Sequence, residues 1–257
     1  MFNKIPLRIL YIFLLLTTYS INSNTHEFWI EPIQYQSKDS LVTAHLRVGQ
    51  EFQGMALMYN PKDFKSFKIL SGTKNTKEEV KGILGDVPAI ETKTDLENLL
   101  IIYHETTDKL VNYKKFEKFE DFVKEKGYQN LINLHKDKEF PESNFVESYR
   151  RYAKSLIAVK GNDGNDKKTG LLFEFVLDQN PYKDLDSNQF TATLYYKKRP
   201  LKNNLVTVFS KYKNSKLSVS SVRTDDKGKF NFKIESGKEY LLDSVVIYPV
   251  KGNPEKK

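Results

Sequence analysis

Residues 171–250 form a series of short alternating segments separated by turns, and this pattern constrains the fold more than any other feature. The segments are LLFEFVL, QFTATLYY, LVTVFSKY, KLSVSSVRT, KFNFKIE and EYLLDSVVIYPV. Alternation of apolar and polar residues is typical of half-buried strands. Six or seven strands at intervals of about ten residues favour a small β-sandwich. In TDDKGKF, Asp225 and Asp226 can cap their own backbone and Gly228 allows a positive φ, so a hairpin turn is predicted there.

The N-terminal half shows the same alternation. Two strands are expected within residues 27–52, where LVTAHLRVG alternates strictly, and further strands near 67–70 and 99–103. The charged segment 72–96 has weak periodicity, which indicates a long loop or hairpin. The seventeen phenylalanines and fifteen tyrosines of the chain suit the cores of sheets.

A helical pattern interrupts the strands. Apolar residues recur at helical spacing over residues 116–134, and Gly127 breaks the pattern into two short helices. The segment VESYRRYAKSLIAV is helical or extended. GNDGNDKKTG, at residues 161–170, has the composition of a flexible connector. We therefore predict a mainly β chain with two β-sandwich-like domains, residues 24–165 and 170–250, the first carrying a short helical insertion at about 116–135.

The first 23 residues have the order of a cleavable export signal. Lys4 and Arg8 precede or flank an apolar run from Ile9 to Leu16, and a small polar segment ends at Ser23. This run is shorter than the roughly 20 residues of a membrane span, so we expect no span after the signal is removed. The chain has no cysteine, which excludes a lipid-anchoring cysteine, disulfides and thiolate chemistry. Export without disulfides fits a bacterial periplasm.

The charge pattern argues against nucleic-acid binding. The whole chain has 41 basic and 33 acidic residues, and because two of the basic residues lie in the signal, the mature excess is six positive charges. The lysines are dispersed and interleaved with acids, as in EKFEDFVKEKG. A nucleic-acid footprint requires basic residues gathered on one face.

The mature N-terminus is a candidate metal site. Cleavage after Ser23 would leave Asn24, Thr25 and His26 as the first residues. A terminal amine, two backbone amides and an imidazole can form the square-planar four-nitrogen site that Cu(II) and Ni(II) favour. Alternatively, His26 merely opens the first strand. Glu27 is a nearby oxygen donor.

The other histidines are weaker candidates. His104 ends the apolar strand LLIIY and His135 closes the helical segment, which are positions typical of capping or surface histidines. His45 shares an exposed strand face with Arg47. No two histidines have the i, i+4 spacing of a helical metal site, so a site containing His26, Glu27, His104 and His135 must be assembled across the fold.

Catalytic motifs are absent from the sequence. It contains no GxSxG, no HExxH, no phosphate-binding glycine loop and no cysteine, so we do not predict an enzyme. Arg150, Arg151, Tyr152 and Lys154 form a basic aromatic cluster that could hold a carboxylate or an anionic chelator, or form an exposed helix face. Trp29 is expected to pack in the core with a partner for its indole nitrogen.

Eight segments, taken in order, resemble a known family. They are HEFWIEP, LRVGQEFQG, FEDFVKEKG, ESYRRYAKSLIAVKG, FEFVLDQNPY, YYKKRPLKNNLVTVF, RTDDKGKFNFKI and GKEYLLDSVVIYPV. The family is a periplasmic domain of unknown function whose members are described as nickel-uptake-type proteins or periplasmic components of cobalt transport systems. The resemblance implies that the C-terminal domain is immunoglobulin-like or carboxypeptidase-regulatory-like, and it implies periplasmic metal handling. Family members often place histidine first or second after the signal, whereas here Asn24 and Thr25 precede His26.

Two functions follow as hypotheses. The first is a periplasmic accessory protein that binds a divalent transition metal and assists its uptake; nickel or cobalt is expected ahead of copper or zinc. The second is a non-enzymatic interaction module that recognises a partner protein without metal, such as the membrane component of a transporter.

Overall fold

The computed structural model describes residues 27–184, 188–213 and 215–250. These described residues are mainly β, with 48% strand, 10% helical residues and two α-helices, which confirms the predicted class. Within these residues no helix has the length and apolar character needed to cross a membrane.

Two sheets from the first part of the chain enclose one core. Sheet A contains β1 (Glu27–Pro32), β3 (Leu41–Gln50), β4 (Gln53–Leu57) and β7 (Ile90–Lys93). Sheet B has the order β2 (Gln36–Ser37), β11 (Tyr152–Val159), β8 (Asn98–Thr106), β5 (Phe64–Ser71) and β6 (Lys77–Glu79). A short 3-10 turn, Pro61–Asp63, precedes β5.

The burial of these strands follows their sequence patterns. Along β3, Val42, Ala44 and Leu46 are buried and point into the core between the sheets, as the alternation predicts. Strand β8 is buried along nearly its whole length. Its Leu100 and Ile102 belong to the core between the sheets, whereas alternate residues pack on the opposite face. Segment 72–96 is more ordered than a simple loop, because β6 and β7 join it to the two sheets.

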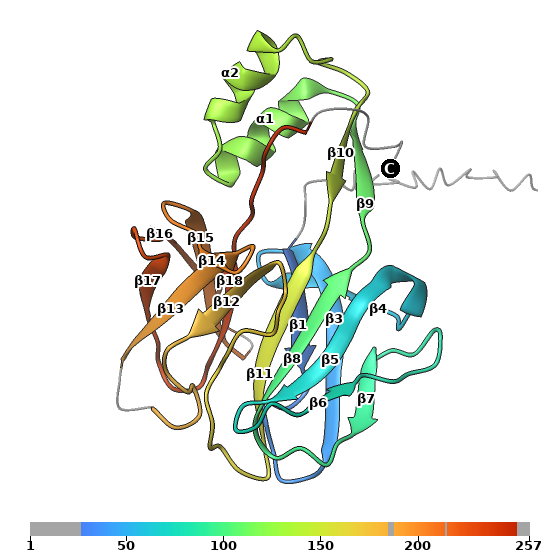
Figure 1. Cartoon of the computed structure of the whole chain (residues 1–257), viewed down its shortest axis with the longest axis vertical. Coiled ribbons are helices and arrows are strands. Elements are labelled where there is room, and N and C mark those ends of the chain that lie inside the picture. The colour runs from blue at the N-terminus through green and yellow to red at the C-terminus, as the bar shows by residue number, and fades with distance from the viewer. Residues whose placement is uncertain (1–26, 185–187, 214, 251–257) are drawn as a thin grey trace, which may run out of the picture.

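A helical insertion projects from sheet B. Strands β9 (Lys109–Tyr113) and β10 (Phe145–Tyr149) pair only with each other, and between them lie α1 (Phe116–Glu125) and α2 (Asn130–Asp137). Figure 1 shows this ribbon rising from β8 and β11 to the two helices. Gly127 has φ of +79° at the break between the helices, which confirms the prediction of two short helices.

The remaining strands form two further sheets around a second core. Sheet D contains β12 (Phe173–Leu177), β13 (Gln189–Tyr196), β14 (Arg199–Pro200) and β17 (Lys229–Lys233). Sheet E contains β15 (Leu205–Tyr212), β16 (Ser218–Arg223) and β18 (Lys238–Asp243). The predicted turn before β17 is confirmed: Gly228 has φ of +73°, and the Asp225 carboxylate accepts from the amides of Lys227 and Lys229.

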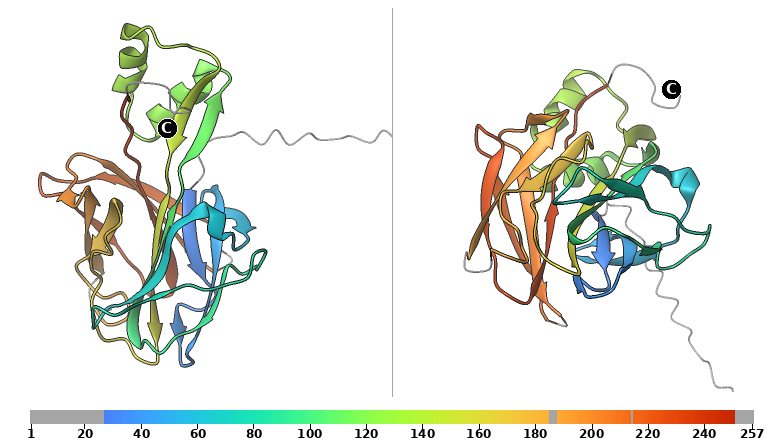
Figure 2. Two further views of the ribbon diagram at one scale, coloured as in Figure 1. Left: turned by 45° about the vertical axis from the view of Figure 1, so that its right-hand side comes forward. Right: turned by 60° about the horizontal axis from the view of Figure 1, so that its bottom comes forward.

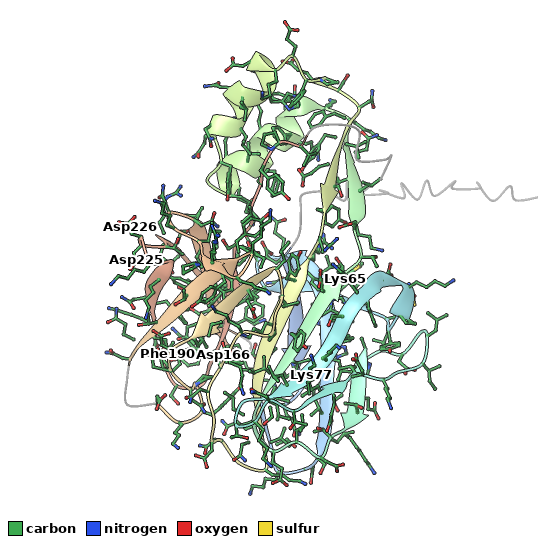
Figure 3. The ribbon with its side chains drawn as sticks, viewed as in Figure 1. Lys65, Lys77, Asp166, Phe190, Asp225 and Asp226 are labelled. Atoms are coloured by element: carbon green, nitrogen blue, oxygen red, sulfur yellow. The ribbon has the colours of Figure 1, made fainter. Side chains whose placement is uncertain are left out.

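The predicted flexible connector is tied to its neighbours. Residues 161–170 have no helix or strand, but the Asn180 amide donates to the carbonyls of Asn162 and Gly164 at 2.7 and 2.8 Å. Asp166 forms an ion pair with Lys154 of β11 at 2.7 Å. Asp166 lies between sheet B and the C-terminal sheets (Figure 3). The composition of this segment predicted a lack of regular structure but could not reveal these long-range bonds.

The sheets are arranged in a ring (Figure 2). This arrangement does not by itself divide the chain into two sandwiches, so the division into two domains stays a prediction. After β18, the chain rises towards the helices (Figure 1), where Ile247 packs against their apolar cluster.

Candidate functional site

A cavity of about 1680 Å³ lies among the N-terminal sheets, the C-terminal sheets and the helical insertion. Its wall includes residues of β1, α1, β10, β11 and β18, together with the segment that follows β18. Small-molecule sites usually have volumes of roughly 300–1,000 Å³, so this cavity can accommodate an organic ligand. Three groups of charged residues on its wall determine its chemistry.

The first group surrounds Lys126, at the end of α1. The Lys126 ammonium lies 2.9 Å from Asp243, 2.9 Å from Glu125 and 3.7 Å from Glu27. The lysine side chain is only 6% exposed. Burial alone would lower the pKa of Lys126, but Asp243 and Glu125 outweigh this effect and raise it. The ammonium therefore stays charged and joins the first strand, the helical insertion and the last strand.

Glu27 is incompletely satisfied in this group. Its Oε2 is buried and has no hydrogen-bond partner among the described residues. Burial and the neighbouring Asp243 raise the pKa of Glu27 to about 7, although Lys126 acts in the opposite direction. One carboxylate oxygen of this cavity-lining residue thus lacks a hydrogen-bond donor among the described residues.

The second group is a partly buried acid on β10, the strand that follows the helices. The Glu147 carboxylate accepts a hydrogen bond from the Tyr113 hydroxyl at 3.2 Å. Burial raises the pKa of Glu147 to about 7, and the bond from Tyr113 only partly offsets this. The two residues lie close together because β10, which follows the two helices, pairs antiparallel with β9.

The third group is the predicted basic aromatic cluster, which the fold divides. Arg150 binds Asp108 through two bonds of 2.8 Å and Glu105 through one of 2.9 Å. Lys154 pairs with Asp166 and donates to the carbonyls of Lys167 and Phe175. These residues lie on strands or strand connections, so the alternative of an exposed helix face is wrong.

Arg151 differs from its two basic neighbours. Its guanidinium lies over the Tyr149 ring, 4.9 Å from the ring centroid. No ion pair or side-chain hydrogen bond involves this guanidinium within the described parts of the chain. Burial lowers the pKa of Arg151.

The predicted metal residues are found in separate environments. His26 lies outside the described residues. Glu27 is at the cavity wall. His104 is 1% exposed in the core of the N-terminal sheets, and His135 is 8% exposed under the helices, where its Nε2 lies 2.9 Å from the Pro141 carbonyl. Neither of these histidines is a surface residue, so that expectation is wrong; the hydrophobic segments around them bury the rings.

His104 is surrounded by aromatic side chains. Its ring contacts Phe28, Phe64 and Phe67 with centroid distances of 5.3, 4.8 and 4.8 Å. Both ring nitrogens are buried without a partner among the described residues, and burial lowers the pKa of His104 to about 3. Over residues 27–184, 188–213 and 215–250, no three His, Cys, Asp or Glu side chains form a group that could hold a metal ion.

Trp29 packs as predicted, but its nitrogen does not find a partner. The ring is 4% exposed and contacts Phe52 at 5.8 Å, next to Phe209 of the C-terminal sheets. The indole Nε1 has no hydrogen-bond partner in the described structure. Trp29 therefore packs at the contact between the first strand and the C-terminal sheets and also lines the cavity.

Lys126, Glu147 and Asp243 were not expected from the sequence as site residues. Lys126 and Asp243 are separated by 117 positions, and Lys126 lies in a charged helical segment whose lysines all resemble surface residues. The one local signal for Glu147 is its position in the alternating segment FVESY, two residues after Phe145 on the same strand face.

The comparisons with known proteins give one match. A family model with the description domain of unknown function (DUF4198) matches residues 23–247. No curated protein and no solved structure matches the chain.

Proposed function

This chain belongs to the DUF4198 family of domains of unknown function, and we propose that it is a periplasmic accessory protein that binds nickel or cobalt as its cargo and assists uptake of the metal. The observation that carries this proposal is the unpartnered Oε2 of Glu27. This carboxylate directly follows His26 in the chain and lies at the wall of the cavity.

The charges around Glu27 favour a cation. Glu27, Glu125 and Asp243 share the single ammonium of Lys126, so their ionised forms leave an excess of negative charge. A cation next to Glu27 stabilises the ionised carboxylate and offsets the burial that raises its pKa. Imidazole and carboxylate ligands together suit nickel and cobalt.

The amino terminus supplies the remaining ligands in this proposal. After cleavage at Ser23, the terminal amine would belong to Asn24, and His26 would be the third residue, immediately before Glu27. His104 and His135 are two further candidates from the sequence. Both are enclosed by aromatic side chains, so we place the cargo at His26 and Glu27 instead.

Calorimetric titration of the exported, untagged protein with Ni(II), Co(II), Cu(II) and Zn(II) tests the proposal. We expect a Kd below about 1 μM for Ni(II) or Co(II). His26→Ala should abolish this binding, and Glu27→Gln should weaken it about tenfold or more, the loss of one supporting ligand. His45→Ala, the same change on the half-buried face of β3, should leave it unchanged. Absence of binding to all four ions contradicts the proposal.

A second function, recognition of a partner protein without metal, is favoured by an exposed apolar patch. Met58, Ile83, Leu84 and Val87 are each more than half exposed. They are near one another because the backbone of Tyr59 bonds to both Gly85 and Asp86. Clustered exposed apolar side chains often mark interaction sites.

The two functions can be separated by measuring how variants of the protein bind the purified membrane component of a metal transporter, the partner expected from the sequence. If the patch recognises the partner, the double variant Ile83→Ser, Leu84→Ser should lose binding, whereas His26→Ala should retain it. Leu110→Ser, which changes an exposed leucine on β9, is the matched control. Equal binding by all three variants contradicts recognition through the patch.

The separate cores also support the predicted domain division. Residues 30–159 and residues 190–232 contribute two distinct clusters of buried side chains. We propose that they correspond to the two β-sandwich-like domains, 24–165 and 170–250, with an immunoglobulin-like or carboxypeptidase-regulatory-like arrangement in the second.

A further inference from the structure

We propose that the cavity binds an amphiphilic monocarboxylate, with Arg151 as the group that recognises the carboxylate. The proposal rests on the cavity and on the pairing of its charged residues. It does not depend on metal binding at His26.

Arg151 differs from the neighbouring cations because those cations are already paired with carboxylates of the protein. Arg150 and Lys154, on either side in the sequence, have their carboxylate partners within the protein. Lys126, across the cavity, is surrounded by three carboxylates. Lys213 also lines the cavity without an ion pair among the described residues, but it is exposed to solvent. Among the described residues of the cavity wall, Arg151 is therefore the partly buried cation that has no ion pair.

The position of the guanidinium suits a carboxylate. The guanidinium lies over the Tyr149 ring, with Cζ 4.9 Å from the ring centroid. Its N–H donors have no hydrogen-bond partner among the described residues, so they can form two parallel bonds to a carboxylate. An uncompensated charge in a partly buried position is unfavourable, so a bound anion would stabilise the folded protein. The lowered pKa of Arg151, caused by burial, agrees with this environment.

The rest of the ligand is inferred from the wall. The cavity is lined by apolar side chains from β1, the helices and β18, among them Trp29, Phe122, Leu131, Leu241 and Ile247. Most of its acids pair with a cation of the protein: Asp243 with Lys126, Asp108 with Arg150, and Asp166 and Glu174 with Lys154. Glu147 is instead held in an environment that favours the protonated form. A partly buried Arg151 without an ion pair in the described structure, together with apolar walls, fits a ligand with a single carboxylate and an apolar body.

Decanoate is a suitable probe, and 1-decanol is its uncharged control. Titrations followed by Trp29 fluorescence and calorimetry are performed in EDTA with the tag-free protein, so that loss of metal binding cannot affect the result. We expect decanoate to bind at least about tenfold more tightly than 1-decanol, which corresponds to roughly 1.4 kcal/mol.

Arg151→Gln should remove this preference by weakening decanoate while leaving 1-decanol unchanged. Arg151→Lys retains the charge but not the paired donors, and it should give an intermediate affinity. Arg199→Gln, an exposed arginine of β14 outside the cavity wall, should behave like the wild type. Circular dichroism and the thermal midpoint establish that each variant is folded.

Three results would overturn the assignment: no decanoate binding by the wild type, equal affinity for decanoate and 1-decanol, or unchanged decanoate affinity in a folded Arg151→Gln. Nickel titration of the same variants separates this site from the metal site. Arg151→Gln should retain nickel binding, and His26→Ala should retain decanoate binding.

Discussion

At the scale of a single residue, burial of His104 makes the stability of the folded protein sensitive to acid. Its folded pKa is about 3, whereas an unfolded histidine has a pKa near 6.5. Between these values the unfolded chain binds a proton that the folded chain does not, so stability is lost as the pH falls from about 6.5 towards 3. The limiting slope is about 1.4 kcal/mol per pH unit.

We predict that His104→Leu has a shallower loss of stability below pH 6.5 than the wild type. At pH 7 the variant should be equally stable or slightly more so, because two unpartnered nitrogens are replaced by an apolar group of similar size. Urea denaturation between pH 4 and 8 measures both effects. Parallel curves for the two proteins would contradict this account.

Glu147 has the opposite pH dependence. Its folded pKa of about 7 exceeds the unfolded value of 4.5, so the folded chain retains the proton longer and stability is lost as the pH rises from about 4.5 through 7. We predict that Glu147→Gln matches the wild type below pH 4.5 and exceeds its stability above pH 7, by on the order of 2 kcal/mol. Denaturation midpoints at pH 4, 6 and 8 test this.

Tyr113→Phe is the control for Glu147. It removes the hydrogen bond that holds the pKa of Glu147 down, so the loss of stability towards high pH should extend further than in the wild type. If Glu147→Gln shows the same pH profile as the wild type, burial of this carboxyl is not the cause. Glu27 titrates in the same range, so part of the dependence should persist in either variant.

At the scale of elements, the ion-pair network of Lys154 connects β11, the connector and β12. The side chains of Asp166 and Glu174 are each 3% exposed, and Lys154 is their shared cation. We predict that Lys154→Met lowers the free energy of unfolding by about 3–5 kcal/mol, because it leaves two buried carboxylates without a cation, although both keep hydrogen bonds from backbone amides. Urea denaturation measures the change.

Lys183→Met is the matched control for this network. Lys183 pairs with Asp163 at 2.6 Å, but both side chains are more than half exposed, and such exposed pairs contribute little to stability. A similar effect of the two substitutions would show that burial of the network is unimportant. Asn substitution at Asp166 in the Lys154→Met background should recover part of the loss.

Elements were easier to predict than their contacts. The alternation of β3 and the helical spacing broken by Gly127 are local patterns, and the structure confirms the elements they predict. The partners of Arg150 and Lys154 could not be predicted, because they depend on which strands become neighbours. For the same reason the sequence favoured capping or surface positions for His104 and His135, although packing of distant aromatic residues buries both.

At the scale of the whole molecule, the segment after β18 attaches the helical insertion to the C-terminal sheets. The carbonyl of Val245 accepts bonds from Asn204 at 3.0 Å and from Tyr128 at 3.2 Å, and Ile247 packs against the helical cluster. We predict that deletion of residues 245–257 increases amide hydrogen exchange in α1 and α2 while β8 stays protected. Mass spectrometry of exchanged peptides measures this.

Deletion of residues 251–257 alone is the control, because it retains Val245 and Ile247. It should leave exchange in both helices at the wild-type level. Unchanged exchange after the longer deletion would show that β9 and β10 are sufficient to hold the insertion.

The meeting of three distant residues at the Lys126 ammonium has a consequence for synthesis. Glu27, Lys126 and Asp243 come from the first strand, the middle of the chain and the last strand. During translation Asp243 emerges only after the other described strands have been made, so the cavity wall cannot close earlier. A chain arrested before β18 would hold an incomplete wall, and ligand binding would therefore report that β18 has been made and has joined sheet E.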